Sequence, residues 1–266
     1  MSFWEHLDVL RAVLIRIALV VTLIAAVAFC FKDALFNIVL APKDDSFITY
    51  RLFDKVATFT GDSDAGFEVQ LVNTGLARQF IVHVKTAFSI AILLAVPYIL
   101  YQLFLFIQPA LYENERKYAL RLVGSGYLMF MTGVAICYFI IFPFTFRFLG
   151  TYQVSGDVDN MITLDSYMST LIMMGITMGV MFELPVVFWL LAKMGIVSSE
   201  FMRKYRKHAL VIILIAAAII TPTSDIFTLL ITSLPIYVLY ELSVLIAART
   251  EKSAHPTTAS NLKQSF

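Results

Sequence analysis

Charged side chains are scarce in this sequence, and they fall in blocks. Only 15% of the 266 residues are charged, whereas 59% are hydrophobic. Runs without any charge separate the blocks, and a run such as Thr86–Ile107 is long enough to cross a hydrocarbon core of about 30 Å. The net charge of +1, with more than half of the chain apolar, leaves no basic domain for nucleic acid. The chain is therefore predicted to be a polytopic membrane protein that does not bind nucleic acid.

The residues that build common catalytic and metal sites are also sparse. The two cysteines, Cys30 and Cys137, lie in apolar segments and form neither a disulfide framework nor a metal site. The four histidines fall in separate segments, and the sequence has no nucleotide-binding P-loop, zinc-protease or serine-hydrolase motif. We therefore expect no catalytic site, no metal and no cofactor, which argues against an ATPase or a hydrolase.

Six apolar segments predict an all-α integral membrane protein with six transmembrane helices. The expected spans are Ala12–Phe31, Thr86–Ile107, Leu122–Phe146, Ser166–Ala192, Ala209–Ile220 and Ile226–Ala248. The first is too long for the apolar core of a cleaved signal peptide and follows two acids, so we interpret it as a retained span. The fifth has room for only about 18 Å of helix. The last two spans are therefore predicted to be short, either as a re-entrant hairpin or across a locally thinned bilayer.

The parts outside the membrane are a loop and a tail. Lys32–Lys85 is the longest polar segment and is predicted to form a small extracytoplasmic cap. Within it, Phe67–Val72 alternates apolar and polar residues after a glycine-containing turn region, as a strand of a hairpin would. The predicted organisation is a six-span membrane domain over residues 1–248 and a disordered tail over residues 249–266.

The distribution of lysine and arginine predicts the orientation. Twelve lie on the side of both termini, and seven lie on the opposite side, where the short loops are almost bare of positive charge. The positive-inside rule weighs short loops most heavily, so both termini are predicted to be cytoplasmic.

Two acids lie inside predicted spans. Glu183 precedes Lys193 by ten residues and Glu241 precedes Arg249 by eight, so both are expected roughly 12–15 Å below the cytoplasmic anchors. An ionisable group at that depth is a functional-site candidate, although a protonated acid bonded to a neighbouring helix would serve packing alone. From the residues alone, a proton-coupled secondary transporter that uses both acids and a protein-binding scaffold fit equally well.

A polar hinge, Leu105–Arg121, separates two apolar runs. Pro109 ends the helix before it, and Asn114 is a candidate cap for the helix after it. Glu113 and Glu115 are thereby expected at the membrane surface beside a helix N-terminus. Complementing a helix dipole, worth about 0.3–1 kcal/mol, would be their simplest role.

A series of short motifs resembles the TatC family, the multispanning receptor subunit of the twin-arginine protein translocase. The motifs are His6-Leu7 with Leu10-Arg11, Ile107–Tyr112 with Glu115-Arg116, Phe139–Pro143, Gly179 with Phe182–Pro185, Met194–Ile196 with Arg203-Lys204, and Thr221-Pro222 with Asp225. They occur in the family's order from residue 6 to residue 225. Each motif is weak alone, but the series is specific.

The resemblance implies a function that composition does not. It implies that the chain binds the twin-arginine signal peptides of folded cargo at the cytoplasmic face of a bacterial inner membrane. It also implies a hetero-oligomer with single-span TatA- and TatB-like subunits in the lipid bilayer, driven by the proton-motive force and without catalysis by this chain.

The resemblance also implies three sets of site residues. The signal-peptide set is Glu115, Arg116, Glu5, Asp8, Arg11 and Phe106. The intramembrane polar groove for partner helices is Glu183, Gln102 and Glu241, and the external-side candidates are Asp225 and Pro42.

The chain departs from the family at one recognition position. Where TatC proteins commonly carry a glutamate two residues before the arginine of the amino-terminal motif, this chain has Val9. If the segment is helical from early enough, Glu5 shares the face of Val9, whereas Asp8 is rotated by about 100°. Glu5 is therefore the better geometric substitute, and Asp8 stays open as the nearer acid in sequence.

Overall fold

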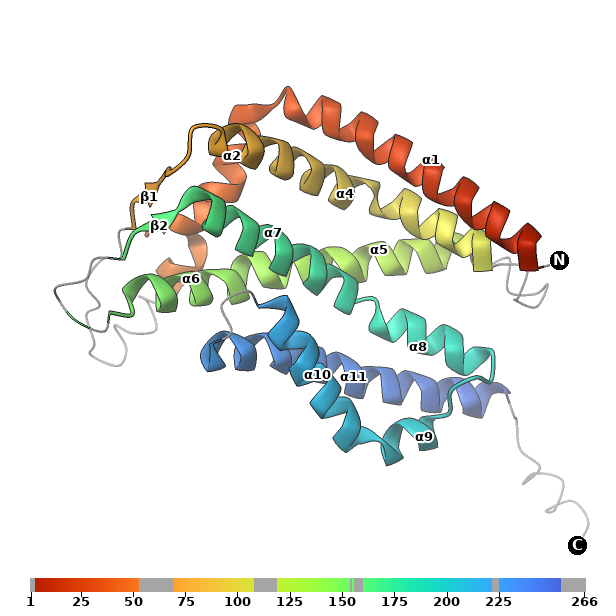
Figure 1. Ribbon diagram of the computed structural model, residues 1–266. Coiled ribbons are helices and arrows are strands. Elements are labelled where there is room, and N and C mark those ends of the chain that lie inside the picture. The colour runs from red at the N-terminus through yellow and green to blue at the C-terminus, as the bar shows by residue number, and fades with distance from the viewer. Residues whose placement is uncertain are drawn as a thin grey trace, which may run out of the picture. The chain divides into compact units, whose positions relative to one another are not determined.

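The computed structural model describes residues 3–52, 69–107, 119–153, 155, 160–221 and 225–254. The chain divides into two compact units, Met1–Gly179 and Val180–Phe266. Within the described residues, five helical segments are long and apolar enough to cross a membrane (Figure 1). They are Trp4–Phe29, Arg78–Phe106, Leu122–Thr151, Leu164–Lys193 and Ile226–Glu251. The chain is an all-helical integral membrane protein, as its hydropathy predicted.

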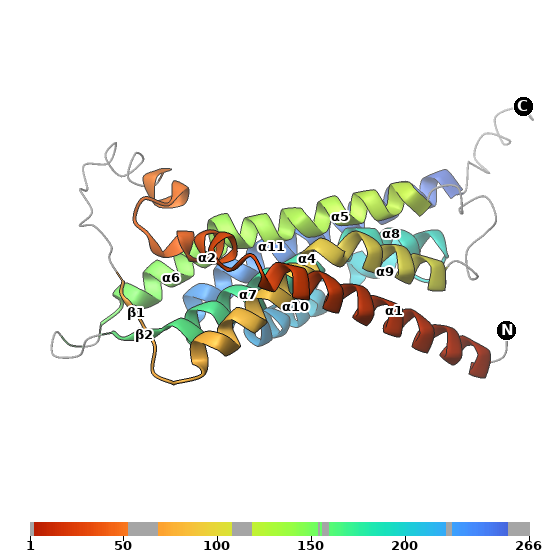
Figure 2. The ribbon, with the colours of Figure 1, turned by 90° about the horizontal axis from the view of Figure 1, so that it is seen from above.

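The first unit holds most of the labelled helices. Its elements are α1 (Phe3–Phe29), α2 (Lys32–Leu40), the 3-10 turn η1 (Ala41–Lys43), β1 (Leu71–Val72), α4 (Arg78–Ile107), α5 (Ala119–Ile136), the π-helix η4 (Cys137–Ile141), α6 (Phe142–Thr151), β2 (Ile162–Thr163) and α7 (Leu164–Met181). Figure 2 shows α5 and α6 joined through η4 into one long rod. In this unit, α2, β1 and β2 lie at the end opposite the amino terminus (Figure 1).

Small residues bring the helices of the first unit close together. Ala87, Ala91 and Ala95 recur every four residues on α4 and are buried, and α1 packs along α4. Side chains at this spacing share one helix face, and small ones let two backbones approach. Gly179 serves α7 in the same way, because an added Cβ would lie 2.7 Å from the ring of Phe130 on α5.

A proline in the third span ties the first loop to the membrane helices. Pro143 has no N–H to donate to the carbonyl of Phe139, four residues earlier. The hydroxyl of Thr49 donates to that carbonyl instead. The neighbouring Tyr50 hydroxyl lies 3.0 Å from the carbonyl oxygen of Pro42 and 3.1 Å from that of Pro143. Burial raises the pKa of the Tyr50 hydroxyl, which keeps its proton available for these bonds.

The predicted hairpin in the first loop is wrong for the described residues. The observed strand β1 contains only Leu71 and Val72, and it pairs in parallel with β2. Leu71 lies opposite Ile162, and Val72 lies opposite Thr163. The strand therefore pairs with the loop that precedes α7, so the cap is built from both loops. The first part of the predicted strand, Phe67 and Glu68, lies outside the described residues.

The second unit corrects the prediction of two short final spans. Its elements are α8 (Leu184–Lys193), α9 (Ser199–Lys204), α10 (Arg206–Ile220) and α11 (Ile226–Ala254). With 15 residues, α10 rises only about 22 Å and is as short as expected. In contrast, α11 has 29 residues and is long enough to cross a bilayer. Only the fifth predicted span is therefore short.

The predicted disordered tail also begins too early. Helix α11 continues past Arg249 to Ala254, and the carboxylate of Glu251 accepts hydrogen bonds from the backbone N–H and the hydroxyl of Ser199. Ser199 is the first residue of α9, so Glu251 holds the end of one helix against the start of another. This contact explains why residues 249–254 are helical; residues 255–266 lie outside the described part of the chain.

The bond from Thr49 to Phe139 predicts a stability change. Thr49→Val keeps the side-chain shape but removes the donor from a part-buried carbonyl, a loss of about 1 kcal/mol. We expect a lower midpoint of thermal unfolding in detergent for Thr49→Val, whereas Thr49→Ser, which keeps the hydroxyl, should stay near the wild type. Equal midpoints for Thr49→Val and Thr49→Ser would show that the bond contributes nothing to stability.

Candidate functional site

The amino-terminal residues predicted to bind a ligand lie on one exposed helix end. Helix α1 begins at Phe3, so Glu5 lies in its first turn. Glu5, Asp8, Val9 and Arg11 are all exposed. For Glu5 to share the face of Val9, the helix has to begin before Glu5, and it does. Glu5 therefore lies one turn before Val9 on the same face of α1.

The start of α1 contacts the end of α4. The ring of His6 stacks on the ring of Phe106, with centroids 4.2 Å apart and planes 25° from parallel. Phe106 is the penultimate residue of α4, directly before the polar hinge in sequence. Sequence reasoning selected Phe106 but missed His6, although His6 opens the amino-terminal motif. The structure thus brings the acids of α1 and the start of the hinge into one region.

The hinge itself is only partly described. Residues 108–118, with Glu115 and Arg116, lie outside the described residues, so their predicted roles stay predictions. Their described neighbours are the end of α4 at Ile107 and the start of α5 at Ala119.

Glu183 lies where the fourth span breaks. Helix α7 ends at Met181 and α8 begins at Leu184, which Pro185 follows. Pro185 cannot donate to the carbonyl of Met181, four residues earlier, so the α pattern stops there. Glu183 takes the N-cap position of α8, but its side chain does not cap the helix. Its Oε1 atom is buried and receives no hydrogen bond from any described residue, which leaves a carboxylate available inside a membrane helix.

Gln102 is a second polar group inside an apolar helix. It is buried in α4, where its Nε2 donates to the hydroxyl of Tyr98 at 2.8 Å. Its Oε1 is buried and receives no hydrogen bond within the described structure. Gln102 therefore retains an acceptor for a further donor.

Glu241 is paired, unlike Glu183. Its Oε2 lies 2.7 Å from Arg206 Nη2, and the hydroxyl of Tyr237 donates to Oε1 at 3.2 Å. The pair joins the start of α10 to α11 within the second unit. This arrangement gives Glu241 a packing role that the sequence had left as one of two options.

The two external-side candidates have local contacts of their own. Asp225 Oδ1 accepts from the backbone N–H of Thr228 at 2.7 Å and so caps the start of α11. Pro42 is buried in η1, where its carbonyl accepts from Tyr50. Both residues therefore shape the backbone at the ends of helices.

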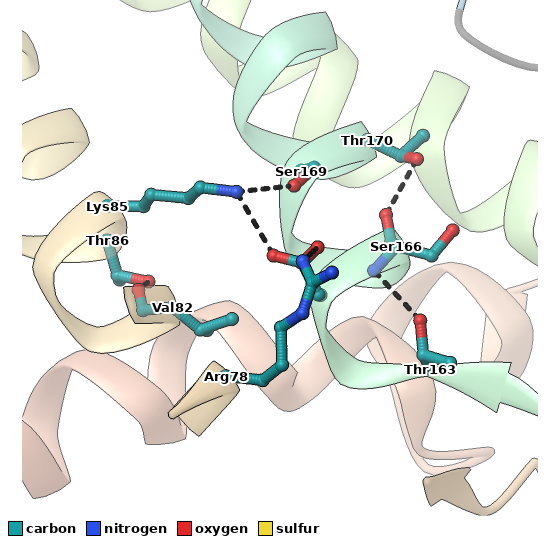
Figure 3. Close-up of polar contacts among 9 residues, drawn as sticks. Arg78, Val82, Lys85, Thr86, Thr163, Ser166, Ser169 and Thr170 are labelled. Atoms are coloured by element: carbon teal, nitrogen blue, oxygen red, sulfur yellow. Dashed lines mark hydrogen bonds and ion pairs between the residues drawn. The ribbon is translucent and has the colours of Figure 1, made fainter. Parts of the chain in front are cut away.

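A charged cluster that lies at the α2 end of the first unit was not predicted from the sequence. Asp165 of α7 lies 2.7 Å from Arg78 Nη1 and 3.0 Å from Lys85 Nζ, both on α4, and Lys85 also reaches the hydroxyl of Ser169 at 3.4 Å (Figure 3). Arg78, Lys85 and Asp165 all lie at the edges of apolar runs, and this position in the sequence could have indicated the cluster. Within the described residues, no group of three histidine, cysteine or acidic side chains is placed to hold a metal ion.

Comparison with known proteins identifies the family. The family model for TatC, the Sec-independent protein translocase protein, matches residues 5–235. A protein named Sec-independent protein translocase protein TatC from Blattabacterium sp. subsp. Periplaneta americana is 34% identical over 258 residues, which cover 95% of this chain and 97% of the relative. The protein of that name from Helicobacter pylori strain J99 is 41% identical over 198 residues, or 74% of this chain and 78% of its own.

A solved structure agrees with these relatives. The crystal structure of the twin arginine translocase receptor TatC superposes with a TM-score of 0.75 at 28% identity, and the match covers 92% of this chain and 99% of the other. The same protein in DDM gives a TM-score of 0.75 and covers 91% of this chain. Sequence and fold therefore agree over nearly the whole length. The chain belongs to the TatC family and is a multi-pass membrane component of the Sec-independent, twin-arginine protein translocase rather than an enzyme.

Proposed function

We propose that this TatC protein binds twin-arginine signal peptides where α1 begins and α4 ends. The observation that carries the proposal is the stack of His6 on Phe106, with ring centroids 4.2 Å apart. It fixes the acidic start of α1 beside the residue that leads into the hinge containing Glu115 and Arg116.

The chemistry of the ligand favours this region. Two guanidinium groups on a signal peptide are best held by carboxylates, because such pairs form bidentate, charge-assisted hydrogen bonds. Each bond of this kind contributes about 1.5–3 kcal/mol. Glu115 is the hinge acid that matches the family motif, and we assign it the main contact.

The second acid is provided by α1. Val9 replaces the family's glutamate, and Glu5 lies one helical turn earlier on the same exposed face. Asp8 is exposed as well but points about 100° away from that face. We therefore assign the second contact to Glu5, with Asp8 as its competitor, and place Arg11 and Arg116 in the charged surroundings.

We further propose that the broken fourth span receives single-span partner subunits. Glu183 offers a buried carboxylate oxygen at a break in the helix, and a polar group within hydrocarbon gains most from a donor on another helix. Gln102 supplies a similar free acceptor on α4. TatA- and TatB-like subunits with a polar residue in their span have the matching chemistry.

A proton-coupled transporter is the weaker alternative. That function needs two titratable acids within the membrane domain that are free to exchange protons. Glu241 instead forms an ion pair with Arg206 at 2.7 Å. Of the two acids, Glu183 alone then remains for proton exchange. A single acid suits a docking residue better than a proton relay.

Substituting the acids tests signal-peptide recognition. Glu115→Gln should cut crosslinking of a twin-arginine peptide roughly tenfold, the equivalent of losing about 1.4 kcal/mol. Glu5→Gln should cause a smaller loss, while Val9→Glu should preserve or strengthen crosslinking. Crosslinking to a peptide with two lysines in place of the arginines is the background control. Undiminished crosslinking in Glu115→Gln would remove the hinge from the proposal, and a loss in Asp8→Asn but not in Glu5→Gln would reassign the second contact.

Replacing Glu183 tests partner assembly. Glu183→Ala should weaken copurification of the single-span subunits and lower export, while protein levels stay near the wild type. Glu183→Gln, which keeps an acceptor, should retain more assembly than Glu183→Ala. If Glu183→Ala instead removes the folded protein from the membrane, the residue serves packing and the docking role is lost.

The orientation can be tested with reporters. If the positive-inside rule holds, a reporter fused after Phe266 or inserted within 203–207 will be cytoplasmic, and one inserted within 61–66 will be external. An external carboxyl terminus would overturn both the orientation and the placement of the recognition site.

A further inference from the structure

The first unit contains a partly open apolar cavity. Its volume is about 290 Å³, and its walls come from α2, α4, η4, α5 and α7. Its lining includes Ile90 and Leu93 on α4, Met131 on α5, and Ile172 and Gly175 on α7. The volume is nearly twice the roughly 150 Å³ of an apolar cavity that stays dry and holds one benzene molecule.

The few hydroxyls in the lining are already bonded. Thr86 donates to the carbonyl of Val82 and Ser89 to that of Lys85, each one turn earlier on α4. The hydroxyl of Tyr138 donates to the carbonyl of Ile38 at 2.6 Å. The protons of these three hydroxyls are therefore already engaged in hydrogen bonds within the protein. An occupant of this cavity must consequently be apolar.

The shape of the cavity favours a chain over a helix. The lining on α4 runs from Thr86 to Leu93, about 10 Å along the axis. This length is most of the roughly 15 Å of hydrocarbon in one leaflet. An acyl chain is thinner than a helix, which is about 10 Å across with its side chains, so a single chain is the occupant better suited to this apolar space.

The charged cluster described above lies beside this cavity. Lys85 lies one turn before the lining residue Ser89 on the same face of α4, and Ser169 lies three residues before the lining residue Ile172 on α7. Figure 3 shows Lys85 and Arg78 converging from α4 on the start of α7. Two cations share the single carboxylate of Asp165, so the cluster carries one excess positive charge. Both cations remain about half exposed, at 54% for Arg78 and 45% for Lys85.

We propose that the cavity binds one acyl chain of an anionic glycerophospholipid, whose phosphate contacts Lys85 and Arg78. The apolar lining selects the chain, and the excess charge at the edge of the hydrocarbon selects a negative headgroup. In the orientation proposed above, the lipid comes from the outer leaflet.

Filling the cavity tests the site of the acyl chain. An added Cβ at Gly175 meets no atom within 4 Å, so Gly175→Leu should place its side chain in the cavity without strain. Gly124→Leu is the control: it is likewise a helix position with no atom within 4 Å, although more exposed than the half-buried Gly175, and it lies outside the lining. The full chain in detergent is titrated with phosphatidylglycerol or phosphatidylcholine, and bound lipid is counted by native mass spectrometry. Gly175→Leu should weaken phosphatidylglycerol binding about tenfold, and Gly124→Leu should not.

Two further variants distinguish binding of the acyl chain from binding of the headgroup. Ser89→Leu fills the cavity from α4 and should reproduce the loss, which guards against misfolding of one variant. Lys85→Gln should weaken phosphatidylglycerol binding more than phosphatidylcholine binding, so that the preference for phosphatidylglycerol comes close to one. Equal lipid binding by Gly175→Leu and Gly124→Leu would overturn the proposal. So would variants that keep the lipid but lose a single-span subunit, because the occupant would then be a partner helix.

Discussion

A backbone carbonyl inside hydrocarbon needs a donor from within the protein, and proline removes donors from the helices of this chain. Two prolines meet this constraint in different ways. At Pro143 the helix continues through the π-helix Cys137–Ile141, and Thr49 from the first loop donates to the carbonyl of Phe139. At Pro185 the helix stops at Met181 and restarts at Leu184, which leaves Glu183 in the break. The bond from Thr49 anchors the cap to the third span, and the break at Pro185 places a polar residue within the fourth span.

The polar groups of the membrane domain consequently divide into two kinds. Arg206 with Glu241 and Arg78 with Asp165 are satisfied within their own units, and they hold helix to helix. Glu183 and Gln102 each retain a buried acceptor that no described residue satisfies. We propose that these two acceptors serve a partner outside the chain, because an unsatisfied buried acceptor is destabilising, whereas Glu241 is already satisfied by Arg206.

Hydropathy was sufficient to predict the five described helices that are long enough to cross a membrane, because each apolar run can be read along the chain without knowing its neighbours. The helical spacing of the first residues also agrees with the early start of α1, which places Glu5 one turn before Val9. The errors came from partners distant in sequence. Strand β1 pairs with β2 rather than with a neighbour, and α11 extends to Ala254 because Glu251 caps α9 from 52 residues away. The pairing of Glu241 with Arg206, 35 residues apart, belongs to the same class.

The contacts of the first loop also impose an order on biosynthesis. Thr49 bonds to a residue 90 positions later, Tyr50 to one 93 positions later, and Val39 receives its bond from Tyr167, 128 positions on. At about 5–20 residues per second, the ribosome needs roughly 5–18 s to make the first 90 of those residues. Throughout that interval the loop has been made but its anchors have not. Until the third and fourth spans are inserted, Thr49 and Val39 lack these long-range partners, while Tyr50 can already bond to the nearby carbonyl of Pro42.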